Sequence, residues 1–145
     1  MPAETASLER FVSAQRHVYA QVRDELRAGD KRSHWMWFVF PQIAGLGRSP
    51  MARQYAVADR SEAEAYLRHD ILGPRLAECT DIMLGWAGRR SAEAVLGTID
   101  AMKLRSCMTL FEAAGGGERF ARAIDSFFAG QRDQRTLAIL EAIAV

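Results

Sequence analysis

The segment SHWMWFVFPQIAGLGRSP, residues 33–50, gathers side chains whose types could do chemistry. His34 belongs to the residue type that exchanges a proton near neutral pH, so it could act as a general acid or base. Trp35 and Trp37 could stack on the face of a planar ligand. Each residue also has a structural interpretation, because the histidine could bond a backbone carbonyl and the tryptophans could pack in the core. The segment is therefore a candidate wall of a site.

The glycine-containing loop that follows is a candidate anion site. Residues 45–47 read Gly-Leu-Gly, but Pro50 stands where a dinucleotide fingerprint needs its third glycine, and the Walker A pattern is absent. Arg48, the Ser49 hydroxyl and the free N–H groups of a helix starting at Pro50 could instead converge on a negative group. The alternative is a tight turn in which the glycines satisfy backbone geometry.

A second cluster lies in DAMKLRSCMTLF, residues 100–111. Lys103, Ser106 and Cys107 are spaced i, i+3 and i+4, which places them on one face of a helix. Lys103 borders an apolar stripe, so it either extends to water or enters a cleft. A Lys–Ser pair can activate a hydroxyl only inside a pocket without water. Asp100 is interpreted as the N-cap of this helix, and no catalytic residue can be named from the spacing.

We expect the two clusters to form facing walls of a cleft for an anionic, planar ligand such as a nucleotide or an ADP-ribose-like compound. The expected ligand-binding residues are His34, Trp35, Trp37, Gln42, Arg48, Ser49, Lys103, Ser106 and Thr109. The competing hypothesis is a non-catalytic interaction module, whose aromatic block at residues 34–40 docks a partner protein. Nucleic-acid binding ranks last, because the net charge is only +1. Enzymatic activity and oligomeric state stay open.

Composition favours a single globular domain over residues 1–145. Hydrophobic residues make up 49% and charged residues 26%, as in ordinary globular proteins. The first residues lack the features of a signal peptide, and no apolar run reaches the roughly 18 residues of a membrane span, so we expect a cytoplasmic protein without a membrane partner. Cys79 and Cys107 show no metal-ligand spacing; we expect reduced core cysteines, no metal site and no cofactor.

The elements that must position these clusters are predicted to be helices. Their periodicity predicts an all-α fold, a compact globule of about seven to eight short helices. Apolar residues between Leu8 and Leu26 predict one helix of about twenty residues, capped by Ser7 and stopped at Gly29. The block HWMWFVF fits either a short strand or two helical turns, and it ends before Pro41.

Capping signals predict where most of the other helices begin. The spacing of Ser61 and Glu64 predicts a capping box for a helix towards His69. Further helices are expected to begin at Ser49-Pro50, Ser91 and Asp133, to run between Leu72 and Gly88, and to end at the glycines near positions 97, 115 and 130.

Three blocks, KRSHWMWFVFPQIAGLGRSPMARQYAV, EAEAYLRHDILGPRLAEC and DAMKLRSCMTLF, resemble the bacterial family catalogued as domain of unknown function 1810. The resemblance runs from Leu8 to about Leu140. It implies a small all-α fold, a cytosolic bacterial protein and no established activity. The motif positions that it implies are His34, Trp35, Trp37, Pro41, Gln42, Gly45, Gly47, Ser49, Tyr55, His69, Arg75, Lys103, Ser106, Met108, Thr109 and Phe111.

This chain departs from the family pattern in two places. Asp70 replaces a usual proline, and Cys107 replaces a usual second serine, which weakens the idea of a catalytic hydroxyl at that position. Proteins of this family sometimes carry the label calpastatin. Protease inhibition of that kind would need extended, disordered repeats, whereas this chain is predicted to be compact and helical.

Overall fold

The computed structural model describes the backbone of residues 2–143 and the side chains of residues 8–143. In this range the chain forms ten helices, so the expected all-α class is confirmed and the expected count was too low. The helices are α1 (Pro2–Gln15), α2 (Tyr19–Ala28), α3 (Met36–Val39), α4 (Pro50–Gln54), α5 (Arg60–Arg68), α6 (Leu72–Leu84), α7 (Ala92–Leu96), α8 (Thr98–Ala113), α9 (Glu118–Phe128) and α10 (Gln134–Ile143). None of these helices is long and apolar enough to cross a membrane.

The first predicted helix is two helices, α1 and α2, separated by a turn at residues 16–18. The break lets α1 pack on α3 and α5 while α2 packs on α6. Gln15 marks it, because its buried side-chain amide donates to the Phe38 carbonyl oxygen at 2.7 Å. Apolar spacing continues across the turn, so periodicity does not reveal it. Ser7 lies inside α1 and is no N-cap, whereas Gly29 ends α2 at a φ of +67° as predicted.

Two further caps differ from the prediction. The predicted capping box at residues 61 and 64 is wrong. Helix α5 has its N-cap at Asp59, two residues before Ser61, and the Asp59 carboxylate accepts a hydrogen bond from the Glu62 N–H at 2.9 Å. Asp100 is not an N-cap either, because α8 begins at Thr98 directly after Gly97, whose φ is +90°. Asp100 therefore lies in the first turn, where its carboxylate is available for ion pairs.

The other three caps are confirmed. Ser49 accepts a hydrogen bond from the Ala52 N–H, Ser91 accepts one from the Ala94 N–H, and Asp133 accepts one from the Thr136 N–H. A capping oxygen satisfies one of the free N–H groups of a helix start. The caps fix where α4, α7 and α10 begin, and α10 thereby starts beside α8.

The aromatic block forms one helical turn, α3, instead of a strand. Phe40 ends this turn directly before Pro41. Most of the block is buried, including Trp35, Phe38 and Phe40, while Trp37 is partly exposed. The block is therefore mainly part of the core.

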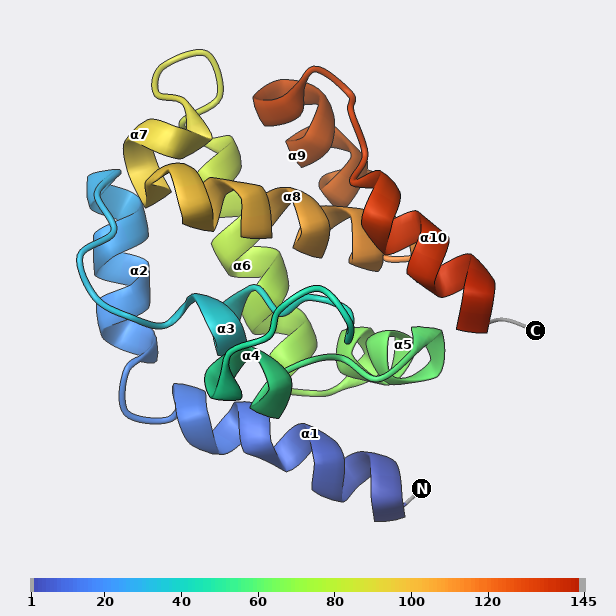
Figure 1. Cartoon of the computed structure of the whole chain (residues 1–145). Helices are drawn as coiled ribbons and strands as arrows, with labels where there is room; N and C mark the ends of the chain where they lie inside the picture. The colour runs from blue at the N-terminus through green and yellow to red at the C-terminus, as the bar shows by residue number, and fades with distance from the viewer. Residues whose placement is uncertain (1, 144–145) are drawn as a thin grey trace.

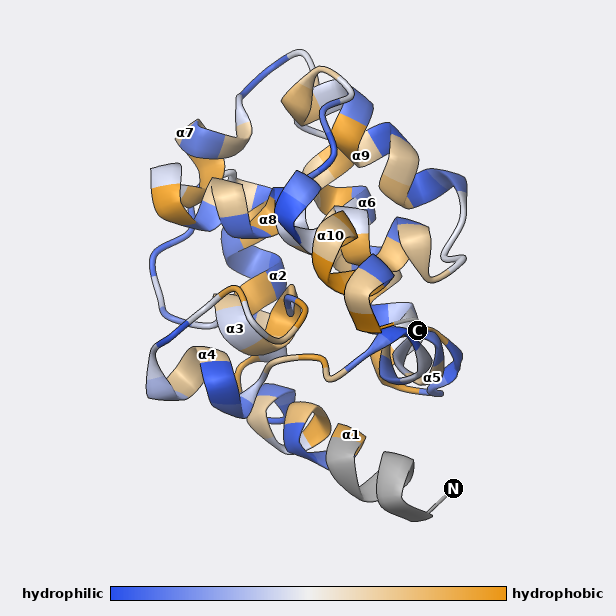
Figure 2. Cartoon of the chain, turned by 45° about the vertical axis from the view of Figure 1, so that its right-hand side comes forward, coloured by the Kyte–Doolittle hydropathy of each residue, from blue (hydrophilic) through white to orange (hydrophobic). Residues whose placement is uncertain are grey.

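Helix α8 lies at the centre of the molecule and crosses in front of α6 in Figure 1. It contacts α5, α7, α9 and α10. Blue and orange residues alternate along most helices in Figure 2, as expected where one face of a helix meets a core. A row of rings runs through that core, with centroids 5.2 Å apart for Phe11 and Tyr66, 5.2 Å for Tyr66 and Phe111, and 6.0 Å for Phe111 and Phe120. This row joins α1, α5, α8 and α9.

Candidate functional site

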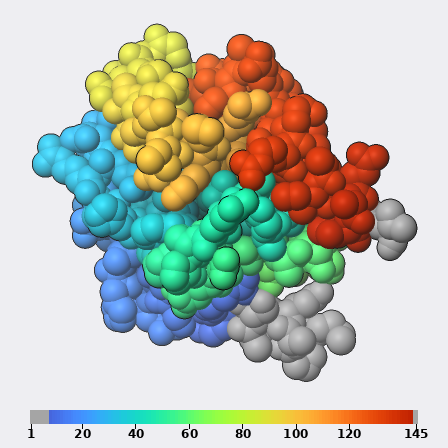
Figure 3. All heavy atoms as spheres, in the orientation of Figure 1, coloured from blue at the N-terminus to red at the C-terminus, as the bar shows by residue number. Residues whose placement is uncertain are grey.

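A shallow cleft of about 250 Å³ lies between the loop at residues 42–47, the first half of α8 and the start of α10. Figure 3 shows these three segments, coloured teal, gold and red, meeting on the face turned to the viewer. The residues that line the cleft are Gln42, Leu46, Gly47, Ile99, Met102, Lys103, Arg105, Ser106, Asp133 and Arg135.

Lys103 is held at the cleft by two neighbours. Its Nζ lies 5.2 Å from the centre of the Trp37 ring and 3.6 Å from the Asp100 carboxylate. Asp100 is shared, because it also pairs at 2.8 Å with Lys31, whose side chain is only 7% exposed. Two ammonium groups therefore share one carboxylate, so Asp100 does not fully neutralise Lys103.

Ser106 joins α8 to the start of α10. Its hydroxyl donates to Asp133 Oδ2 at 2.9 Å, and that carboxylate also accepts hydrogen bonds from the N–H and hydroxyl of Thr136. The Asp133 N–H in turn donates to the hydroxyl oxygen of Thr109 at 2.9 Å. Because Asp133 accepts hydrogen bonds from both helices, its main role is to hold the start of α10 against α8.

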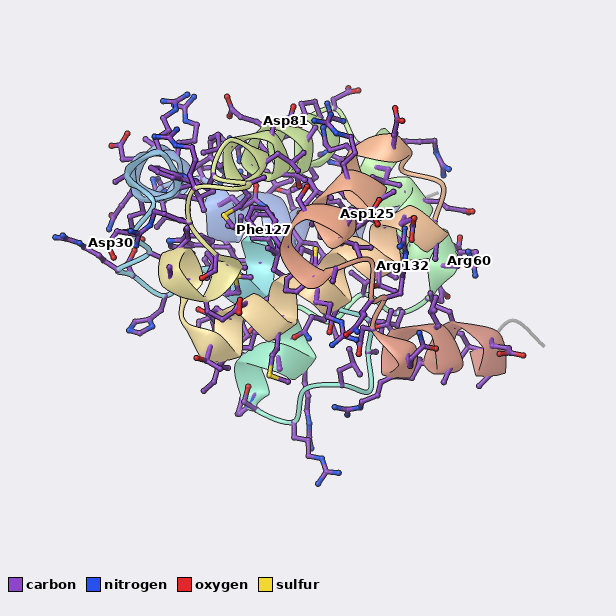
Figure 4. All side chains as sticks on the ribbon, turned by 90° about the horizontal axis from the view of Figure 1, so that it is seen from above. Asp30, Arg60, Asp81, Asp125, Phe127 and Arg132 are labelled. Atoms are coloured by element: carbon purple, nitrogen blue, oxygen red, sulfur yellow. The ribbon has the colours of Figure 1, made fainter. Side chains whose placement is uncertain are left out.

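Arg105 fixes the connection before α10. Its guanidinium donates to the carbonyl oxygens of Gln131 at 2.7 Å and Arg132 at 3.0 Å. Arg132 binds the Glu112 carboxylate at 2.6 and 2.9 Å and also lies beside Asp125 (Figure 4). These hydrogen bonds lower the pKa of Glu112. The segment that carries Asp133 is thus tied to α8 on both sides.

Glu25 organises the loop that leads into the aromatic block. Its carboxylate accepts hydrogen bonds from the N–H groups of Arg32 and Ser33, from the Ser33 hydroxyl and from the indole N–H of Trp35, at 2.6 to 3.1 Å. Burial alone would raise the pKa of Glu25, but these donors outweigh burial and lower it to about 2. Sequence reasoning missed this residue, since nothing in its spacing sets it apart from a surface glutamate.

The structure brings only part of the expected site together. Gln42, Lys103 and Ser106 line the cleft, and Trp37 supports Lys103 from behind. Thr109 is buried behind Ser106, where its hydroxyl donates to the Arg105 carbonyl oxygen at 2.8 Å.

The other four expected residues do not line this cleft. Trp35 is buried and bonded to Glu25. His34, Arg48 and Ser49 are exposed and lie outside the lining, and Ser49 is used as the cap of α4. The anion site expected from Arg48 and Ser49 is thus not part of the wall that carries Lys103.

The expected ligand-binding residues did not include seven of the lining residues: Leu46, Gly47, Ile99, Met102, Arg105, Asp133 and Arg135. One signal was available for two of them. Ile99 and Met102 are apolar, yet they fall outside the buried stripe of α8 that contains Leu104, Met108 and Phe111. An apolar residue on the polar side of an amphipathic helix indicates a contact other than the core.

Other parts of the described molecule are weaker candidates for a functional site. A hollow of about 670 Å³ between α6 and α9 is larger, but its Arg119 is already paired with Asp81 at 2.6 Å. No group of three or more His, Cys, Asp or Glu side chains within residues 8–143 is placed to hold a metal ion. Cys79 and Cys107 are buried thiols, and burial raises the pKa of both, that of Cys79 to about 12. A thiol in that state is a poor nucleophile.

Comparison with known proteins identifies the family but no activity. No curated protein is significantly similar to the chain. The crystal structure of the conserved hypothetical protein Rv1873 from Mycobacterium tuberculosis is similar, with a TM-score of 0.89 and 50% sequence identity over 92% of this chain and 96% of that chain. Residues 5–140 match the family described as "Protein of unknown function (DUF1810)". The chain therefore belongs to that family, as its motifs predicted.

Proposed function

We propose that the cleft between residues 42–47, α8 and α10 binds a small anionic ligand. The observation that carries this proposal is the charge of its lining, which contains Lys103, Arg105, Arg135 and a single carboxylate, Asp133, while the Asp100 carboxylate beside Lys103 is shared with Lys31. Asp133 already accepts hydrogen bonds from Ser106 and Thr136, so it is not free to neutralise three cations.

Polar groups and the helix start support the same ligand chemistry. The Gln42 amide and the guanidinium of Arg135 both line the cleft and can donate hydrogen bonds to an oxyanion. Arg135 lies in the first turn of α10, where the helix dipole also favours negative charge. A phosphate or carboxylate group in the cleft would accept hydrogen bonds from Lys103 and Arg135, and Gln42 belongs to the same lining.

The volume of the cleft narrows the ligand class. Pockets for drug-sized ligands usually measure roughly 300–1,000 Å³, and this cleft measures about 250 Å³. A sugar phosphate or mononucleotide matches this size better than a whole ADP-ribose-like compound. Neither tryptophan is free to stack on a planar ligand in this cleft, because Trp35 is buried and Lys103 lies over the ring of Trp37.

The alternative function, a protein-interaction module, has less support in the geometry. Interface anchors must be exposed, but Trp35, Phe38 and Phe40 are all buried. Only Trp37 of the two tryptophans in this block is partly exposed, and Lys103 lies over its ring. A cytoplasmic location remains part of the proposal, and the free, buried cysteines are compatible with it.

Isothermal titration calorimetry with adenosine monophosphate tests the proposal. We expect Lys103→Ala and Arg135→Ala each to weaken binding at least about tenfold, because a hydrogen bond to a charged group contributes roughly 1.5–3 kcal/mol. Arg27→Ala is the matched control, since Arg27 is an exposed arginine on α2 that lies outside the cleft. Equal weakening by the control, or unchanged binding in both cleft variants, contradicts the proposal.

A further inference from the structure

Two large apolar side chains at the cleft are exposed to water. Ile99 is 72% exposed and Met102 is 66% exposed, and both line the cleft. Among residues 8–143, these are the two most exposed of the four large hydrophobic side chains that lie on the surface. Two such side chains beside a cationic cleft form an apolar surface that the fold itself leaves uncovered.

The core does not account for Ile99 and Met102. Helix α8 buries its other side through Leu104, Met108 and Phe111. Residues 99, 102, 103 and 106 are spaced i, i+3, i+4 and i+7, so they follow one side of the helix. The apolar pair lies towards the start of α8, and Lys103 and Ser106 follow in the direction of α10.

The length of this row sets the size of what can lie along it. Seven residues of helix rise about 10 Å, which is the span from Ile99 to Ser106. Arg135 and Asp133 lie at the α10 side of the cleft, so an anionic group held by Lys103 and Arg135 leaves the remaining length to Met102 and Ile99. Methionine side chains are flexible and suit the covering of a ligand of irregular shape.

We propose that the ligand is an amphiphilic anion: an organic phosphate monoester whose phosphate lies between Lys103 and Arg135 and whose apolar group covers Ile99 and Met102. This inference rests on the proposed anion-binding function and adds the chemical class of the remainder of the ligand. When an apolar group packs against these two side chains, apolar surface on both partners is removed from water. Such a group therefore binds more tightly than a polar group of similar size.

Three probes separate the two parts of the proposal: inorganic phosphate, ribose 5-phosphate and phenyl phosphate. In calorimetric titrations of the wild-type protein we expect phenyl phosphate to bind about tenfold more tightly than ribose 5-phosphate, as partial burial of a ring predicts. The double variant Ile99→Ser, Met102→Ser loses this preference and retains its affinity for inorganic phosphate. Both side chains are exposed, so the variant keeps its fold, which circular dichroism verifies.

The control variant is Ile71→Ser, which removes an exposed isoleucine outside the cleft and keeps the preference for phenyl phosphate. Equal affinities for phenyl phosphate and ribose 5-phosphate, or a preference that survives in the double variant, overturn the amphiphilic class alone. Failure of all three probes to bind overturns the anion-binding function as well.

Discussion

Glu25 shows how a residue can organise a loop near a site that it does not line. Its carboxylate gathers the N–H groups of Arg32 and Ser33 and the indole of Trp35, and so fixes the loop that leads into α3. Lys31 lies in the same loop and shares Asp100 with Lys103. Glu25 thus fixes the loop whose Lys31 pairs with the same carboxylate as Lys103.

The lowered pKa of Glu25 predicts how its contribution depends on pH. Because the folded-state pKa is about 2 and the ordinary value is 4.5, the charged carboxylate stabilises the fold above pH 4.5, and this stability is lost as the pH falls towards 2. We expect Glu25→Gln to lower the free energy of unfolding by about 2–3 kcal/mol at pH 7, with a difference from wild type that shrinks below pH 4.5.

Urea denaturation at a series of pH values measures this effect, with the exposed Glu141→Gln as control. A difference between wild type and the Glu25 variant that stays constant from pH 7 to pH 2 would show that the charge of this carboxylate is not the cause.

Single residues were only partly predictable at the cleft. Lys103 and Ser106 could be placed on one face of a helix because they are spaced i and i+3. Gln42 could be included in the expected site because it directly precedes the glycine-containing loop. His34 could not be placed, because it lies in the loop before α3, where no helical or strand spacing fixes the direction of a side chain. Arg135 could not be singled out either, since only the folded chain brings the start of α10 against α8.

Helix ends show which local signals are decisive. Ser49, Ser91 and Asp133 cap helices as predicted, whereas Ser61 and Asp100 lie next to stronger alternatives. The N-cap of α5 is Asp59, two residues before Ser61, and the N-cap of α8 is Gly97, three residues before Asp100. Both of these wrong predictions chose a residue two or three positions after the N-cap that the structure shows.

Gly29 at the end of α2 gives a test at the scale of the helix. Its φ is +67°, and an added Cβ would lie 2.8 Å from the ring of Trp86, whose indole N–H donates to the Leu26 carbonyl oxygen at 2.8 Å. Gly88 has a φ of +76° with open space around it. We expect Gly29→Ala to cost about 2–4 kcal/mol of unfolding free energy and Gly88→Ala about 1–2 kcal/mol.

Chemical denaturation of both variants separates backbone strain from the clash with Trp86, because both glycines have a positive φ and only Gly29 has the close ring. Equal losses of stability in the two variants would mean that the Trp86 ring moves aside at little cost and does not restrict the residue at the end of α2.

At the scale of the whole molecule, hydrophobic periodicity was sufficient for the fold class and the motifs were sufficient for the family. The cleft was not predictable in full, because its walls come from three segments separated by more than fifty and about thirty residues. Their approach depends on long-range packing, such as the contacts of α8 with α10 and the row of rings from Phe11 to Phe120.

The anion-binding cleft is tested most directly by an amide chemical-shift titration of the isotopically labelled protein with phenyl phosphate. The structure predicts saturable shifts concentrated in residues 42–47, 99–106 and 133–136, and their loss in Arg135→Ala. Shifts concentrated at the hollow between α6 and α9, or spread evenly over exposed arginines, would contradict the assignment of this cleft as the functional site.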